Sequence, residues 1–243
     1  MNVLTKTERV AQQPGSREGA EPRVVLHAVS WRQYVALGNI LQDHPGLRMT
    51  YDRGTLEFMT TSPEHERYKK RLGRLLEALI EECGLKFETA GNMTFQREDL
   101  ERALEPDDCF WIAHEAQMRT REEWDPDQDP PPDLLLEIEI SRSAISRMGL
   151  YSTLGVPEVW RCDGEMLRVH LRQPDGSYVA SETSPTFPGI PAAEIIAFIQ
   201  PNPQLDFLSM VRTFRHWVRE RLSQPQPAQN ASEETGKEEQ EPS

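Results

Sequence analysis

The spacing of apolar residues changes along the chain between a helical and a strand-like period, which predicts a mixture of helices and strands. The clearest helix follows Ser62-Pro63-Glu64, because Ser can cap a helix, Pro suits the first helical position and Glu suits the first turn. Gly84 can end this helix. Further helices are expected at 31–42, 143–154, 191–199 and 206–222.

Short strands are expected between these helices, at 47–51, 55–59, 86–89, 93–96, 107–113, 133–141, 158–162, 166–172 and 178–182. Asp52-Arg53-Gly54 is a turn signal between the first two strands. The polar, Pro-rich stretch 114–132 is expected to be a connection with little helix. Helices before, between and after the strands predict an α/β fold in which helices flank a mixed β-sheet.

Composition predicts one folded domain between two polar ends of the chain. Residues 1–24 and 223–243 hold too few apolar side chains to form a core, so both are expected to be disordered, with the domain at 25–222. No run of about 18 apolar residues occurs, and the N-terminus has no apolar signal-peptide segment. We therefore expect a cytoplasmic protein with no membrane partner.

Charge and cysteine content narrow the function classes. The net charge of −13 opposes the broad basic face of proteins that grip long nucleic acids, so any such contact must be weak, use local positive charge or depend on a partner. The three cysteines are widely spaced and form no CxxC pair. This argues against a disulfide framework and against a structural zinc site.

Two carboxylates lie within the most apolar strand in the middle of the chain, DLLLEIEIS at 133–141. Side chains two positions apart on a strand share a face, so Glu137 and Glu139 are expected side by side, where they repel one another. A divalent cation relieves that repulsion, and Mg²⁺ takes carboxylate and water oxygens. The alternative is an edge strand whose polar face meets water.

A third carboxylate, Asp107, directly precedes the apolar residues Cys109-Phe110-Trp111. It stands at the mouth of a predicted strand, where it could bind the same metal ion as Glu137 and Glu139. An Asp after a Pro is also common in turns, which is the alternative here. The order of an Asp before one strand and E-x-E on the next long strand favours a metal-carboxylate site.

These motifs resemble the PD-(D/E)xK nuclease core, and the chain is similar to the bacterial Uma-two family, whose members are classed as restriction endonucleases. The matching stretches are YDRGTLEFMTTSPEHE at 51–66, EPDDCFW at 105–111, PPDLLLEIEIS at 131–141 and YSTLGVPEVWRCDG at 151–164. The resemblance implies a restriction-endonuclease-like mixed β-sheet flanked by helices. It also implies hydrolysis of phosphodiester bonds in DNA with Mg²⁺ or Mn²⁺, and it leaves a homodimer open.

Carried over by position, the resemblance assigns metal binding to Asp107 and Glu137. Glu139 falls where the nuclease core has Lys, which is a departure, and Arg147 on the following helix could supply the missing positive charge. The alternative for Arg147 is a surface residue. Glu66 matches an acidic helix position that could hold the metal through a water. His65 beside it could bond phosphate, but a lone His is more often a surface residue, and His65 is expected at the surface.

Other functions stay open. The first is a catalytically inactive nuclease-fold domain that binds a nucleic acid or a protein. The missing Lys and the negative net charge favour this alternative, which predicts that no metal binds at Asp107 and Glu137. The second is an interaction or dimerisation module, in which Phe214, Trp217 and Val218 on the last helix form an apolar face. Docking of that helix on the sheet is the alternative. Hydrolysis of another phosphate ester also stays open.

Overall fold

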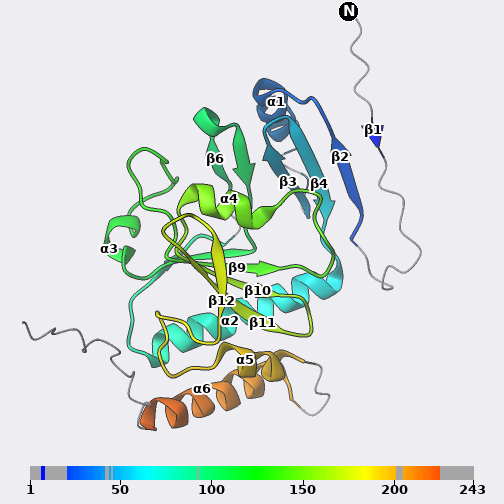
Figure 1. Cartoon of the computed structure of the whole chain (residues 1–243). Coiled ribbons are helices and arrows are strands. Elements are labelled where there is room, and N and C mark those ends of the chain that lie inside the picture. The colour runs from blue at the N-terminus through cyan, green and yellow to red at the C-terminus, as the bar shows by residue number, and fades with distance from the viewer. Residues whose placement is uncertain are drawn as a thin grey trace, which may run out of the picture.

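The computed structural model of the chain describes residues 7–8, 21–41, 44, 46–91, 93–200 and 205–224, and it contains two six-stranded sheets (Figure 1). We name them the N-terminal sheet and the C-terminal sheet. The N-terminal sheet is antiparallel throughout. Its strands, in spatial order, are β1 (Thr7–Glu8), β2 (Arg23–Leu26), β4 (Thr55–Thr60), β3 (Leu47–Asp52), β7 (Arg102–Leu104) and β6 (Phe95–Arg97).

The C-terminal sheet is mixed, because β9 and β10 run parallel whereas its other neighbours are antiparallel. Its strands, in spatial order, are β12 (Tyr178–Ser181), β11 (Leu167–Arg172), β10 (Glu158–Cys162), β9 (Leu134–Ile138), β8 (Asp108–Trp111) and β5 (Glu88–Thr89). This confirms the mixed α/β fold that the sequence predicted.

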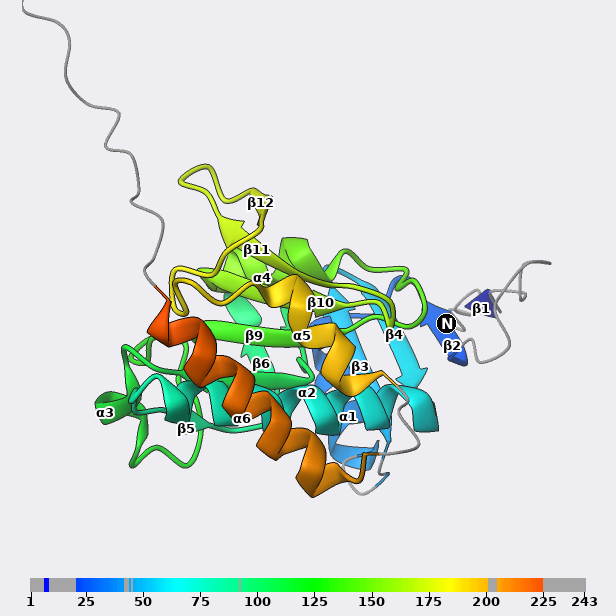
Figure 2. The same cartoon turned by 90° about the horizontal axis from the view of Figure 1, so that it is seen from below.

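Helices cover both faces of the C-terminal sheet. Figures 1 and 2 show α2, α5 and α6 together on one face and α4 on the other, while α1 packs beside β3. The helices are α1 (Trp31–Leu41), α2 (Pro63–Glu82), the short α3 (Glu115–Met118), α4 (Arg147–Leu154), α5 (Ala192–Ile199) and α6 (Phe207–Ser223), with one 3-10 turn at Glu98–Leu100.

The side-chain alternation of β9 explains this layering. Leu134, Leu136 and Ile138 pack into the core beneath α2, α5 and α6. Leu135 packs on the other face in the core beneath α4. Glu137 shares the face of Leu135, since both occupy odd positions on the strand. β9 therefore contacts an apolar core on each face, and it places the carboxylate of Glu137 on the face that α4 covers.

Several element boundaries differ from the predicted ones for local reasons. The helix expected from 143 begins at Arg147, because Ser146 accepts a hydrogen bond from the Gly149 N–H and caps it there. The strand expected to reach 141 ends at Ile138. The strands β1, β2 and β7 were missed. β1 lies within the stretch that was expected to be disordered, and β2 and the buried Glu21 extend the folded part beyond the predicted start at 25. Most of the predicted lead-in, and all but two residues of the predicted tail, lie outside the described residues.

Helix α6 docks on the body of the protein through its apolar face. Phe214 and Val218 are buried, and Trp217 lies 5.3 Å from Phe198 of α5 between ring centroids. This supports the docking alternative over a free apolar face.

All three cysteines are unpaired thiols. Within the described part of the chain, no helix is long and apolar enough to cross a bilayer.

Replacing Phe214 with Ala tests whether α6 is part of the core. Because the ring is fully buried, we expect F214A to lower the free energy of unfolding by about 3–5 kcal/mol. The control L208A changes an exposed leucine of the same helix and should stay within about 0.5 kcal/mol of wild type. Equal, small losses in urea unfolding of both variants would show that α6 does not dock.

Candidate functional site

Asp107 and Glu137 lie side by side because of the pairing between β8 and β9. Asp108 pairs with Leu136 in antiparallel register, so the preceding residue, Asp107, comes opposite Glu137. The backbone N–H of Ile138 donates to Asp107 Oδ2 at 2.7 Å. Two of the carboxylates that the sequence order grouped together are therefore neighbours in space.

Asp107 is fully buried, and two cations neutralise it. Arg48 of β3 places Nη1 2.6 Å from Asp107 Oδ1, and His65 of α2 places Nε2 2.7 Å from the same oxygen. Burial alone would raise the pKa of Asp107, but Arg48 and His65 outweigh it and hold that pKa below its usual range. Asp107 therefore stays ionised at neutral pH.

His65 connects Asp107 to the segment before β2. Its Nδ1 lies 2.8 Å from Glu21 Oε1, and both side chains are fully buried. Burial opposes protonation of the ring, yet the carboxylates of Asp107 and Glu21 raise the pKa of His65 to about 9. The expectation of a surface His65 is wrong, because α2 packs with this side chain toward the junction of the two sheets.

Glu137 is held by the helix that follows it in the chain. Arg147, at the start of α4, places Nε 2.7 Å from Glu137 Oε1, and the hydroxyl of Tyr151 donates to Oε2. Burial raises the pKa of Glu137 above its usual range, Arg147 opposes the rise, and Asp107 adds to it. Arg147 also donates to the backbone carbonyl of Glu105. It is a buried partner of Glu137 and not a surface residue.

A cavity of about 320 Å³ opens beside Glu137. Arg161 of β10 lies opposite Glu137 in the parallel ladder and pairs with Glu139, which comes just after the end of β9. The other wall is the start of α4 and the loop before it. The cavity is lined by Glu137, Glu139, Ser143, Ala144, Ile145, Ser146, Arg147, Met148 and Arg161. Two guanidinium groups and the start of a helix thus meet at one opening, and each guanidinium is paired with a carboxylate of the same lining, Arg147 with Glu137 and Arg161 with Glu139. Guanidinium groups and helix N-termini are groups that bind phosphate.

The N-terminal sheet fixes the loop that forms this wall. Glu57 of β4 is buried and accepts hydrogen bonds from Ser143 Oγ at 2.8 Å and from the Ala144 N–H at 2.7 Å. Arg23 of β2 pairs with Glu57 at 2.7 Å and donates to the carbonyl of Ser141 at 2.9 Å. The position of the loop therefore depends on charges from the other sheet.

The remaining predicted residues are placed less centrally. Glu139 is half-buried at the edge of the cavity, and Glu66 is exposed on the first turn of α2. Sequence reasoning missed Arg48, Glu21 and Arg161. A charged residue within the buried run of β3 was a signal for Arg48; Glu21 and Arg161 gave no comparable signal.

A divalent cation does not fit these residues as they are arranged. Every carboxylate oxygen of Asp107 and Glu137 already has a donor or cation from the protein within contact distance. The buried carboxylates of Glu21, Asp107 and Glu137 face the cations Arg48, His65 and Arg147, so no positive charge is missing. In the part of the chain that the structure describes, no three His, Cys, Asp or Glu side chains are grouped to hold a metal.

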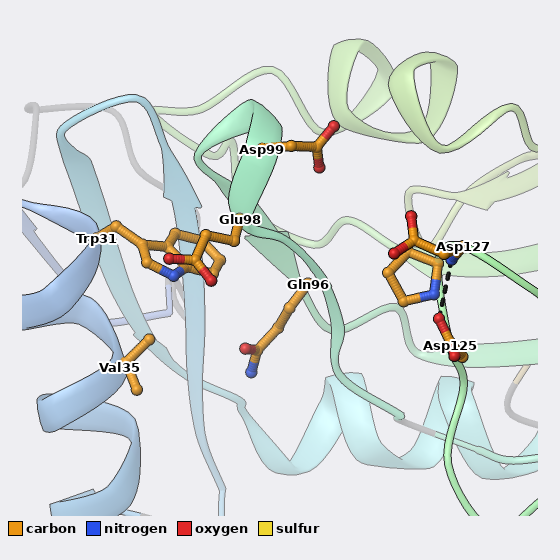
Figure 3. Close-up of a pocket in the computed structure, with 8 residues that line it drawn as sticks. Trp31, Val35, Gln96, Glu98, Asp99, Asp125 and Asp127 are labelled. Atoms are coloured by element: carbon orange, nitrogen blue, oxygen red, sulfur yellow. Dashed lines mark hydrogen bonds between the residues drawn. The ribbon is translucent and has the colours of Figure 1, made fainter.

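A second cavity, of about 730 Å³, shares no residue with the first (Figure 3). Its lining includes one aromatic ring and four carboxylates, from Trp31, Glu98, Asp99, Asp125 and Asp127. Carboxylates repel the phosphates of a nucleic acid, and the lining residues that the structure describes for this cavity include no cationic side chain to balance them. The cavity beside Glu137 is therefore the better candidate for a phosphodiester.

A family model and a solved structure match this chain. The Uma2 family model, described as "Putative restriction endonuclease", matches residues 31–199. A crystal structure described as a putative nuclease belonging to DUF820 from Anabaena variabilis is 13% identical, with a TM-score of 0.43. That match covers 68% of this chain and 90% of the other. No curated protein matches the chain significantly.

The raised pKa of His65 makes the stability of the protein depend on pH. A protonated His65 is favoured in the folded state, so its contribution is full below the unfolded pKa of about 6.5 and is lost as the pH rises through about 9. We expect the free energy of unfolding to fall over that range by on the order of 3 kcal/mol.

Urea unfolding at several pH values measures this dependence. H65Q should lose most of it, whereas H216Q, which changes an exposed histidine on α6, should keep the wild-type profile. An H65Q profile as steep as that of wild type would contradict the assignment.

Proposed function

The chain belongs to the Uma2 family, and from that premise we propose that it is a nuclease that hydrolyses phosphodiester bonds in DNA. The observation that carries the proposal is the cavity beside Glu137, where Arg147, Arg161 and the start of α4 lie together. Guanidinium groups and helix N-termini are groups that bind phosphate. Because the overall charge of the chain is negative, these guanidinium groups are the basis for contact with a nucleic acid.

Each of these side chains has a role in the proposed reaction. Arg161, at the edge of the cavity, binds a phosphate oxygen of the substrate. Arg147 is oriented by Glu137 and by the Glu105 carbonyl, so it presents a fixed charge that stabilises the developing negative charge on the phosphate. Glu137, with its raised pKa, accepts a proton from the water that attacks the phosphorus. The P–O bond to the leaving oxygen then breaks, and that oxygen takes up a proton from solvent.

A dependence on Mg²⁺ or Mn²⁺ stays a prediction of the sequence. The carboxylates do not fit a divalent cation as arranged, so no step above depends on one. The same observation favours a second candidate function: a nuclease-fold domain that binds nucleic acid without cutting it. A homodimer also stays a prediction.

A cleavage assay with the cavity variants tests the proposal. Supercoiled and single-stranded DNA are incubated with wild type, E137Q, R147M and R161M in Mg²⁺, in Mn²⁺ and in EDTA. We expect wild type to cleave, with rates roughly 100-fold lower in E137Q and R147M. R97M, which changes an arginine paired with Asp99 away from the cavity, should cleave like wild type.

Folding and binding controls make each outcome decisive. E137Q and R147M each break a buried ion pair, so their cleavage rates test the site only if their circular dichroism matches that of wild type. R161M changes a partly exposed residue and should fold in any case. Cleavage that survives in R161M and in folded E137Q contradicts the proposed site. Absence of cleavage by wild type, with DNA binding that R161M weakens, supports the non-cutting alternative instead.

A further inference from the structure

Arg48 is a charged residue at the second position of β3, within the buried part of that strand. It is only 5% exposed, and its strand neighbours Met49 and Thr50 are also buried. Burying a guanidinium group without a counter-charge would cost more than the protein can supply. Its partner, Asp107, directly precedes β8 of the C-terminal sheet. The ion pair between Arg48 and Asp107 therefore crosses the junction between the two sheets.

Arg48 and Asp107 form an ion pair without a well-aligned hydrogen bond. Nη1 lies 2.6 Å from Asp107 Oδ1, yet this buried atom makes no hydrogen bond of good geometry. The charge of Arg48 acts on the carboxylates of Glu105 and Glu137 as well as on that of Asp107. One cation thus stands against the buried carboxylate of Asp107, which is where a metal-carboxylate centre would have its metal ion.

We propose that Arg48 takes the place of a metal ion beside Asp107. The free protein then neutralises this carboxylate without a divalent metal and does not bind Mg²⁺ or Mn²⁺ there. Arginine suits this role because it keeps its charge at any pH the protein meets. A divalent ion added beside Arg48, His65 and Arg147 would place excess positive charge in a buried site, where like charges repel strongly. The inference concerns the free protein and does not depend on cleavage.

Removing Arg48 should convert the centre into a metal site. In R48M, the carboxylates of Asp107 and Glu137 stay in place while one cation is lost, so a divalent ion can take its place. We expect wild type to show no heat of Mn²⁺ binding in calorimetry and R48M to bind Mn²⁺ at least roughly tenfold more tightly than wild type. In the matched control R48M/D107N, which removes the carboxylate as well, the gain should be absent.

Thermal unfolding provides a second measurement in case R48M folds poorly. Mn²⁺ should raise the melting temperature of R48M, or restore its folding, and should leave that of wild type at its value in EDTA. Mn²⁺ binding by wild type that D107N abolishes would overturn the proposal. So would an R48M variant that gains neither affinity for Mn²⁺ nor stability from it. Neither measurement involves DNA, so a failed nuclease assay leaves the result intact.

Discussion

The carboxylate of Asp107 carries its charge in a place that water does not reach, and much of the surrounding structure follows from the need to neutralise it. An ionised carboxylate without partners would cost more than the whole stability of a typical domain. Arg48 from the N-terminal sheet, His65 from α2 and the Ile138 N–H from β9 meet at this one group. Charge, as well as apolar packing, therefore holds the two sheets together.

The same requirement connects the fold to the candidate chemistry. Because Asp107 is enclosed by its partners, the cavity beside Glu137 is what the centre presents to a ligand. Arg147 connects the buried carboxylates to the cavity, because it neutralises Glu137 and also lines the cavity. Membership of the Uma2 family suggests a phosphodiester substrate, and the guanidinium groups of the cavity supply the local charge that such a substrate needs in an acidic protein.

The sequence predicted those parts of the site that lie within local patterns. The helical spacing after Ser62 and the apolar strand around Glu137 were sufficient to place α2 and β9, and the order of the acidic motifs was sufficient to pair Asp107 with Glu137. The cations could not be predicted in this way. Arg48 and His65 meet Asp107 only through tertiary contacts between distant segments, and no local pattern specifies such a partner. For the same reason the carboxylates suggested a metal ion, whereas the folded chain supplies its own cations.

The protonation of His65 is the most direct test of this charge balance, because the ring lies between two carboxylates and a neutral imidazole has only one N–H donor. Nuclear magnetic resonance of the side-chain nitrogens of histidine can measure it near neutral pH in the metal-free protein. We expect both nitrogens of His65 to carry a proton and the ring to stay charged well above the ordinary pKa of histidine. A neutral ring at that pH would leave the carboxylate of Asp107 with one cation, Arg48, instead of two, and it would contradict the claim that His65 helps to neutralise it.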